Sequence, residues 1–175
     1  MSLPSPQPLH VFIDGASRGN PGPAAIGTFA YTTDPASPLF ALGYTFYRYT
    51  NNVAEYAALV LALHEIIKRG WTGPVHIHAD SLLVVKQMNG EFRVRDPQLQ
   101  HWHALALKLR AKVACTITHV RREHNTKADA LANQALDEKR APDQSFEKIW
   151  RAAIPRTYWP NDRQQTVLKQ TSLLP

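Results

Sequence analysis

The stretch from Leu9 to Pro23 reads LHVFIDGASRGNPGP, and it contains the first indication of the fold. Its first five residues, 9–13, are mostly apolar and predict a short buried strand. Asp14 follows directly, and the glycines and prolines of 15–23 predict a turn that ends this strand. Carboxylates are seldom buried without a cation, so an acid at the end of a buried strand marks a candidate functional position.

Outward from this stretch, strand-like runs at 24–33 and 39–47 predict antiparallel neighbours. Residues 51–69 are apolar on both faces at helical spacing, which predicts a buried helix. The remaining pattern predicts strands at 75–79 and 113–120 and helices at 82–88, 98–112 and 125–136, with Ser81, Asp96 and Asn125 as their caps. This order predicts an α/β fold in which a mixed sheet is flanked by helices.

The length of 175 residues fits one compact domain, which we expect over residues 9–140. Residues 1–8 form an N-terminal lead, and residues 141–175, where the helical pattern stops and four prolines occur, form a C-terminal tail. The tail contains the aromatic residues Phe146, Trp150, Tyr158 and Trp159. Packing of the tail on the domain is favoured, and anchoring of a partner protein or nucleic acid is the alternative.

The composition excludes several classes of protein. A single cysteine, Cys115, rules out an internal disulfide and a thiolate zinc cluster. The start of the chain does not have the pattern of a signal peptide, and no apolar run is long enough for a membrane span, so we expect a cytoplasmic protein with no membrane partner. We also expect a monomer. The formal net charge of +6 admits a polyanionic partner, and the segment 86–122 alone contains eight basic residues and two acids.

Four acids occur where solvated surface charge is not expected: Asp14, Glu55, Asp80 and Asp129. Each one taken alone is compatible with a helix cap or a salt bridge. A cluster of all four would repel itself unless divalent cations neutralised it. Ligands that offer only oxygen favour Mg²⁺ or Mn²⁺ over Zn²⁺.

The sequences around these acids are DGASRGNPGP at 14–23, TNNVAEYAAL at 50–59, ADSLLVVKQ at 79–87 and NTKADALAN at 125–133. In this order they resemble the type 1 ribonuclease H family, and most closely its compact archaeal and bacterial branch. The resemblance implies a ribonuclease H-like fold with a five-stranded mixed sheet. It also implies that Asp14, Glu55, Asp80 and Asp129 are the catalytic residues and bind two metal ions, Mg²⁺ or Mn²⁺, with Asp14 bridging both.

The activity implied by the resemblance is endonucleolytic hydrolysis of the RNA strand of RNA·DNA hybrids, leaving 5′-phosphate and 3′-hydroxyl ends. In this two-metal-ion mechanism one ion activates water and the other neutralises the departing oxygen. Asn20, Asn51 and Asn52 are implied to recognise the RNA 2′-hydroxyl, and Thr50 to contact a phosphate of the DNA strand. In place of the family's loop histidine, Arg122 or His124 is implied to assist product release.

Two departures from the family concern the grip on the duplex. The short segment 89–95 leaves no room for a basic protrusion, and the lead before Leu9 is too short for a separate hybrid-binding domain. The rival hypotheses are another nuclease of the same fold, such as a transposase, integrase or junction resolvase, and a binding module that has lost catalysis. Cleavage of double-stranded RNA or at single embedded ribonucleotides stays open. A dehydrogenase is excluded because Gly15, Gly19 and Gly22 do not have the dinucleotide-binding spacing.

Overall fold

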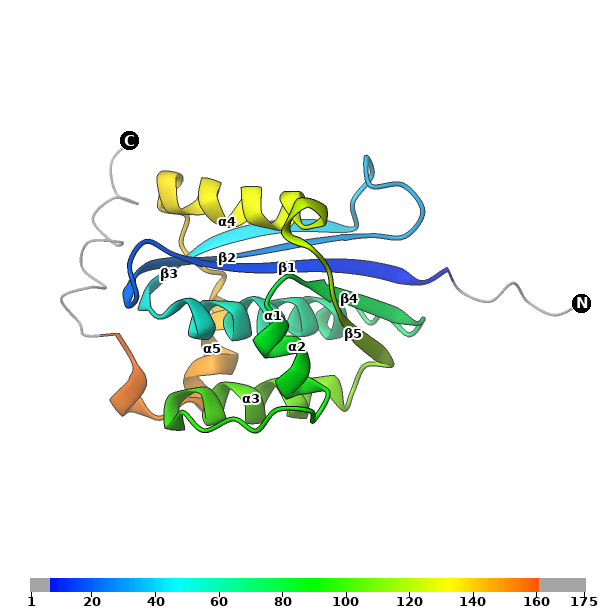
Figure 1. The fold of residues 1–175 in the computed structure, drawn as a ribbon. Helices are drawn as coiled ribbons and strands as arrows, with labels where there is room; N and C mark the ends of the chain where they lie inside the picture. Colours follow the sequence, from blue (N-terminus) through cyan, green and yellow to red (C-terminus); the bar gives the residue numbers. More distant parts are fainter. Residues whose placement is uncertain (1–6, 161–175) are drawn as a thin grey trace, which may run out of the picture.

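The structure is a computed structural model that describes residues 7–160. Its centre is a five-stranded sheet of order β3-β2-β1-β4-β5 (Figure 1). The strands are β1 (Leu9–Ser17), β2 (Gly22–Tyr31), β3 (Phe40–Tyr49), β4 (Val75–Ala79) and β5 (Cys115–His119). The first three strands pair antiparallel, whereas β4 is parallel to β1 and β5 is parallel to β4. The predicted α/β class and its five-stranded mixed sheet are therefore confirmed.

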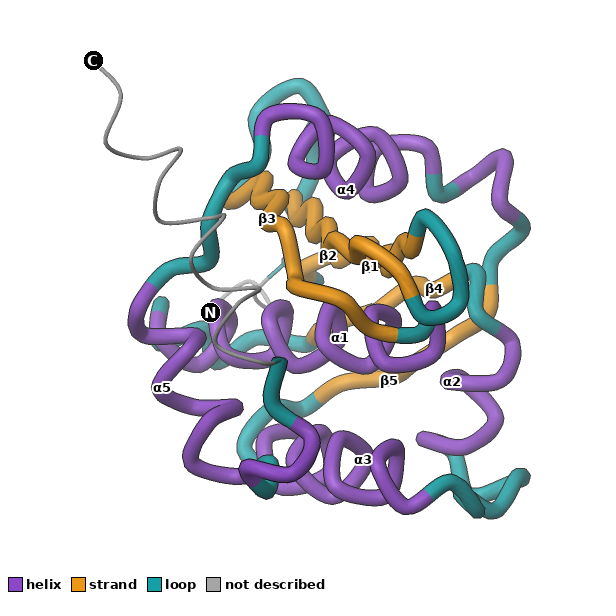
Figure 2. The backbone as a smooth tube through the Cα atoms, turned by 90° about the vertical axis from the view of Figure 1, so that its left-hand side faces the viewer, coloured by secondary structure: helices purple, strands orange, loops and turns teal. Residues whose placement is uncertain are grey.

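Helices cover both faces of this sheet (Figures 1 and 2). They are α1 (Asn51–Lys68), α2 (Leu82–Met88), α3 (Pro97–Arg110), α4 (Thr126–Glu138) and α5 (Gln144–Ala153), with short 3₁₀ turns η1 (Arg122–His124) and η2 (Arg156–Tyr158). Helix α4 lies on one face, and α1 lies on the other between the sheet and α3. This position explains why α1 is apolar nearly all round. Within residues 7–160, no helix has the length and hydropathy that a membrane crossing requires.

Side chains at the helix starts explain where several helices begin. The Thr50, Ser81 and Asp96 side chains accept hydrogen bonds from the backbone N–H groups of Val53, Val84 and Leu99. Each bond satisfies a donor that has no partner inside its helix. The caps predicted at Ser81 and Asp96 are thus confirmed.

Strand β1 continues beyond the point at which the sequence predicts its end. Gly15, Ala16 and Ser17 pair with residues 24–26 of β2, so Asp14 lies inside the strand instead of after it. The prediction that the strand stops at Ile13 was wrong. The strand runs on through residues 15–17. The turn into β2 forms only at 18–21.

Helix α4 packs unusually close to the sheet because two glycines face it. A Cβ atom at Gly27 of β2 would lie 2.2 Å from the backbone oxygen of Ala128. A Cβ atom at Gly43 of β3 would lie 2.3 Å from the backbone oxygen of Leu131. Both positions therefore require glycine if α4 is to keep this distance from the sheet.

The predicted tail contains a helix that the sequence reading missed. Phe146 and Trp150 of α5 are fully buried, and their rings pack against Phe46. The prediction that the helical pattern stops at Arg140 was wrong, because residues 146, 149 and 150 form an apolar stripe and Asp143 caps the helix. Residues 144–158 pack on the domain through this stripe, whereas 161–175 and most of the predicted lead lie outside the described residues.

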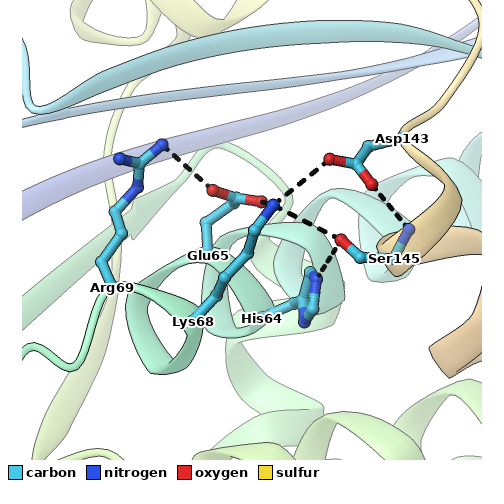
Figure 3. A network of polar contacts seen from close by, with 6 residues as sticks. All are labelled: His64, Glu65, Lys68, Arg69, Asp143 and Ser145. Atoms are coloured by element: carbon cyan, nitrogen blue, oxygen red, sulfur yellow. Dashed lines mark hydrogen bonds and ion pairs between the residues drawn. The ribbon is translucent and has the colours of Figure 1, made fainter.

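A polar network ties the start of α5 to the end of α1 (Figure 3). The Lys68 Nζ atom lies 3.2 Å from Asp143 Oδ2 and 3.4 Å from Glu65 Oε1. Arg69 adds a second cation, 3.1 Å from the other oxygen of the buried Glu65 carboxylate. The remaining members of the network are His64 and Ser145, whose Nε2 and Oγ atoms lie 3.0 Å apart. The tail is therefore held by both apolar burial and ion pairs.

Candidate metal centre

The four predicted acids come from four different elements. Asp14 lies in the central strand β1, and Glu55 lies near the start of α1. Asp80 directly follows β4, and Asp129 lies in the first turn of α4. Because β1 and β4 are adjacent and parallel, their carboxyl ends meet at the same edge of the sheet. The start of α1 is brought to this edge by close contact with Gly15.

Gly15 permits this contact because it has no side chain. A Cβ atom there would lie 2.2 Å from the backbone nitrogen of Glu55. The Gly15 N–H donates a hydrogen bond of 3.2 Å to Glu55 Oε2. The glycine after Asp14 thus places the Glu55 carboxylate beside the Asp14 carboxylate.

Three of the acids form a tight group. Asp14, Glu55 and Asp80 each offer a carboxylate oxygen, and these oxygens lie within 4.8 Å of one another. Asp129 lines the same pocket, which has a volume of about 300 Å³, but it stands outside this group. Its Oδ1 atom accepts a hydrogen bond of 3.1 Å from Arg122 Nη2. The structure therefore brings three predicted ligands together and places the fourth at their side, paired with a cation.

Burial and mutual repulsion raise the pKa values of two of these carboxyls, so both are harder to ionise than usual. Burial, then the charges of Asp80 and Asp129, raise the pKa of Asp14 to about 7, and Arg122 opposes this shift. Burial, then Asp14 and Asp80, raise the pKa of Glu55 well above its usual value. The hydrogen bond from Gly15 lowers the Glu55 pKa, but it offsets only part of the rise. A cation between the acids would relieve both effects.

The donor set fits a hard divalent cation. The three grouped residues offer only carboxylate oxygens, and Asp14 and Glu55 are 5% and 4% exposed. Buried carboxylates without a cation partner are costly, and ions such as Mg²⁺ and Mn²⁺ prefer oxygen ligands. Asp14, Glu55 and Asp80 would hold such an ion, with Asp129 available beside them.

Asn125 connects two elements of the site through a contact that the sequence does not predict. The sequence predicts a helix cap, but the fully buried side chain donates a hydrogen bond of 2.9 Å from Nδ2 to the Ile13 carbonyl. The backbone carbonyl of Asn125 accepts a hydrogen bond of 3.1 Å from the Asp129 N–H. Asn125 thus joins the residue before Asp14 to the turn that holds Asp129. Nothing in the local sequence distinguishes this role from a cap.

The predicted substrate-binding residues surround the start of α1. Asn51 lines the acidic pocket, and its N–H donates to Asn20 Oδ1 at 3.2 Å. Asn52 is exposed and is not among the residues that line this pocket. Thr50 caps α1 and lines a neighbouring pocket. Of these four residues, Asn51 is therefore the one that lines the acidic pocket.

The two candidates for product release occupy different places. Arg122 lines the acidic pocket and pairs with Asp129. His124 lines a separate hollow with Phe12, Tyr31 and Lys127 among its neighbours. The structure thus brings Arg122 to the site and leaves His124 outside it, because the 3₁₀ turn η1 directs residues 122 and 124 to different sides.

Comparison with known proteins gives concordant matches. Residues 13–135 match the family described as reverse transcriptase-like. Ribonuclease HI of Halobacterium salinarum is 43% identical over 131 residues, which cover 74% of this chain and 65% of that protein. A bifunctional protein of Mycobacterium tuberculosis is 41% identical over 71% of this chain. The chain spans about two thirds of the length of the first relative and about one third of the second.

Solved structures of similar proteins have the same fold. The RNase H1 of Halobacterium salinarum gives a TM-score of 0.70 at 42% identity, covering 75% of this chain and 98% of that one. The N-terminal RNase H domain of the Mycobacterium tuberculosis protein gives 0.71 at 37% identity, covering 76% and 96%. LC11-RNase H1, solved in complex with an RNA/DNA hybrid, gives 0.69 at 34% identity, covering 74% and 97%. The chain therefore belongs to the type 1 ribonuclease H family.

Proposed function

We propose that this protein is an endonuclease that hydrolyses the RNA strand of RNA·DNA hybrids and leaves 5′-phosphate and 3′-hydroxyl ends. The observation that carries the proposal is the convergence of Asp14, Glu55 and Asp80 within 4.8 Å, with Asp129 in the same pocket. Family membership supports it, as does the relative whose structure contains an RNA/DNA hybrid. Mg²⁺ is the proposed cofactor, and Mn²⁺ is expected to replace it because both ions prefer oxygen ligands.

The chain's own residues bind the cofactor and orient the substrate. Asp14, Glu55, Asp80 and Asp129 would hold two divalent cations, which supply an activated water and a neutralised leaving oxygen when bound. Asp14, on the central strand β1, is the expected shared ligand. Arg122 balances the Asp129 charge from the side of the pocket.

Recognition of RNA requires groups that contact the 2′-hydroxyl. Asn51 lines the acidic pocket together with residues 15–17. An amide both donates and accepts hydrogen bonds, as the 2′-hydroxyl does. Asn20 fixes the Asn51 backbone by accepting its N–H, so the two amides act as one recognition unit.

The test is cleavage of a hybrid labelled on its RNA strand, in Mg²⁺ and in Mn²⁺. Single-stranded RNA, double-stranded RNA, double-stranded DNA and a duplex with one ribonucleotide serve as competing substrates. Product ends are identified by polymerase extension from the 3′-hydroxyl and by ligation of the 5′-phosphate. We expect Asp14→Asn and Glu55→Gln to abolish cleavage.

Glu91→Gln provides a matched control, because it removes an exposed carboxylate that pairs with Lys86 away from the pocket. It should leave cleavage unchanged. Full activity in Asp14→Asn would refute the proposal. Preferential cleavage of DNA duplexes would favour another nuclease of this fold, and hybrid binding without turnover in either metal would favour a module that has lost catalysis.

A further inference from the structure

Three histidine rings lie together on the face of the sheet that α4 covers only in part. His10 of β1 pairs in register with His76 of β4, and His78 follows two positions later on β4. Because side chains alternate between the two faces along a strand, all three rings share one face. It is the face of α4, since Asp14, four residues after His10, pairs with the Gly27 that faces α4. Helix α4 packs mainly on β1, β2 and β3, and the three rings are half-buried beside it.

Two nitrogens of this cluster have the spacing of ligands on one metal ion. Nδ1 of His10 lies 3.5 Å from Nε2 of His78, whereas the ring centres are 5.8 Å apart, so these nitrogens are on the facing edges of the rings. Two nitrogens that each lie 2.0–2.1 Å from a tetrahedral Zn²⁺ are about 3.3 Å apart. The last side-chain torsion of histidine is broad, so a small rotation of each ring directs both lone pairs toward one ion.

A threonine of β5 determines which nitrogen of His78 carries the proton. The Thr118 hydroxyl donates a hydrogen bond of 3.4 Å to the Ile77 carbonyl, so its oxygen accepts at the 3.2 Å contact with His78 Nδ1. A neutral imidazole carries one proton, which is therefore on Nδ1, and Nε2 presents a lone pair toward His10. Metal-binding histidines donate their other N–H in this way, which fixes the tautomer and the orientation of the ring.

His76 supplies a third imidazole beside this pair. Its ring centre lies 5.5 Å from that of His10, and its Nδ1 lies 2.9 Å from Thr116 Oγ1. Since Thr116 holds Nδ1, Nε2 is the His76 nitrogen available to an ion. The Phe12 ring packs 4.6 Å from the His78 ring and restricts its motion. The cluster therefore has the two parts of a metal site, nitrogen ligands and neighbours that orient them.

We propose that His10, His76 and His78 bind one divalent transition-metal ion, represented by Zn²⁺, with His10 and His78 as the closest ligand pair. Imidazole nitrogen suits Zn²⁺, Ni²⁺ and Cu²⁺, whereas Mg²⁺ and Mn²⁺ prefer oxygen. The site is separate from the carboxylates, because His10 is four residues before Asp14, roughly 13 Å along an extended strand. An ion here joins β1 to β4, the strands that lead to Asp14 and Asp80. It should raise the Tm, since the unfolded chain does not hold the three rings together.

The test is titration of the full-length protein with Zn²⁺ at pH 8, where histidine is mostly neutral, in excess Mg²⁺ that competes for the carboxylates. Isothermal titration calorimetry should find one bound Zn²⁺ per chain. His10→Phe and His78→Phe should each lower the affinity by more than roughly 100-fold, since loss of an outer contact alone costs about 10–100-fold. Phenylalanine keeps the ring packing against Tyr31 and Phe12, and circular dichroism verifies that each variant is folded.

Two variants separate metal binding from a general effect on the sheet. His119→Phe is the matched control, because His119 is exposed on β5 and, one residue after Thr118, points to the opposite face. It should leave the affinity unchanged. Thr118→Val keeps every imidazole but removes the contact to His78 Nδ1, and it should lower the affinity about tenfold. With Cu²⁺ as the probe, nitrogen hyperfine splitting in the electron paramagnetic resonance spectrum should be lost in His10→Phe.

Equal Zn²⁺ affinity in the parent protein, His10→Phe and His78→Phe would overturn the proposal and leave the 3.5 Å contact as a hydrogen bond between two rings. Unchanged affinity in His76→Phe would exclude the third ligand. Loss of Zn²⁺ binding in Asp14→Asn would overturn the proposal in favour of binding at the carboxylates. All of these titrations are made without nucleic acid, so their outcome does not depend on whether the protein cleaves hybrids.

Discussion

Replacement of Asp14 by asparagine should stabilise the metal-free protein while it abolishes activity. Asp14 is 5% exposed and faces the carboxylates of Glu55 and Asp80. Its ionised form is therefore costly in the folded chain and inexpensive in the unfolded chain. Asparagine keeps the shape of the side chain and removes the charge, so the cost disappears.

The magnitude follows from the pKa of this carboxyl. The folded chain raises the Asp14 pKa from 3.8 to about 7. Each tenfold change in proton affinity corresponds to about 1.4 kcal/mol, so ionisation of Asp14 costs the folded state about 4 kcal/mol. Because the new amide forms different hydrogen bonds, we expect a net gain of about 2–4 kcal/mol in the free energy of unfolding. For a chain of this size the gain corresponds to a Tm higher by roughly 5–15 °C.

The gain depends on pH in a defined direction. Because the Asp14 pKa is higher in the folded chain than in the unfolded chain, the folded state binds more protons between these two values. The parent protein thus loses stability as the pH rises from about 4 to about 7, and Asp14→Asn avoids this loss. The difference in stability between the two proteins should be near zero at pH 4 and complete at pH 8.

The assay is thermal and urea denaturation in EDTA across this pH range. Glu91→Gln is the control, because it removes an exposed acid and should change stability by less than about 0.5 kcal/mol. Addition of Mg²⁺ or Mn²⁺ at pH 8 should raise the Tm of the parent protein toward that of the variant. A variant that is no more stable than its parent at pH 8, or a gain that does not shrink on acidification, would refute the reasoning.

Three further predictions concern the neighbours of the site. Gly27→Ala should lower stability by about 1–3 kcal/mol and reduce kcat, because α4 and Asp129 must move; unchanged denaturation curves would contradict this close packing. Trp150→Ala should cost about 3–5 kcal/mol in urea denaturation, and a loss below about 1 kcal/mol would show that the tail is dispensable. Arg122→Ala removes the cation that pairs with Asp129, so the Mg²⁺ concentration for half-maximal thermal stabilisation should fall; a higher concentration would argue that Arg122 assists metal binding.

Much of the fold is predictable because its signals are local. The caps at Ser81 and Asp96 and the apolar faces of α1 depend on residues within a few positions of each other. The length of β1, in contrast, depends on residues that are distant in the sequence. Residues 15–17 become a strand because β2 returns beside them, and their own sequence is typical of a turn. Helix α5 was missed because prolines outside it outweighed the apolar stripe that includes Phe146 and Trp150.

The candidate site, like the fold, is predictable from local sequence only in part. The order and context of the motifs predict which acids to examine, but they contain no distances. The grouping of Asp14, Glu55 and Asp80, and the pairing of Asp129 with Arg122, depend on how strands and helices meet. The hydrogen bond from the side chain of Asn125 spans 112 positions in the chain, so no local pattern reveals it.

The shallow burial of α4 has a consequence for the order in which the molecule opens. The buried residues of α4 are three alanines, Ala128, Ala132 and Ala135, whereas fourteen residues of α1 are buried. Local opening costs less where less apolar surface is covered, so backbone amides of α4 should exchange with solvent faster than those of α1. We therefore expect α4, which holds Asp129, to open before α1, which holds Glu55. The Asp129 carboxylate can therefore move away transiently while the other carboxylates of the site keep their positions.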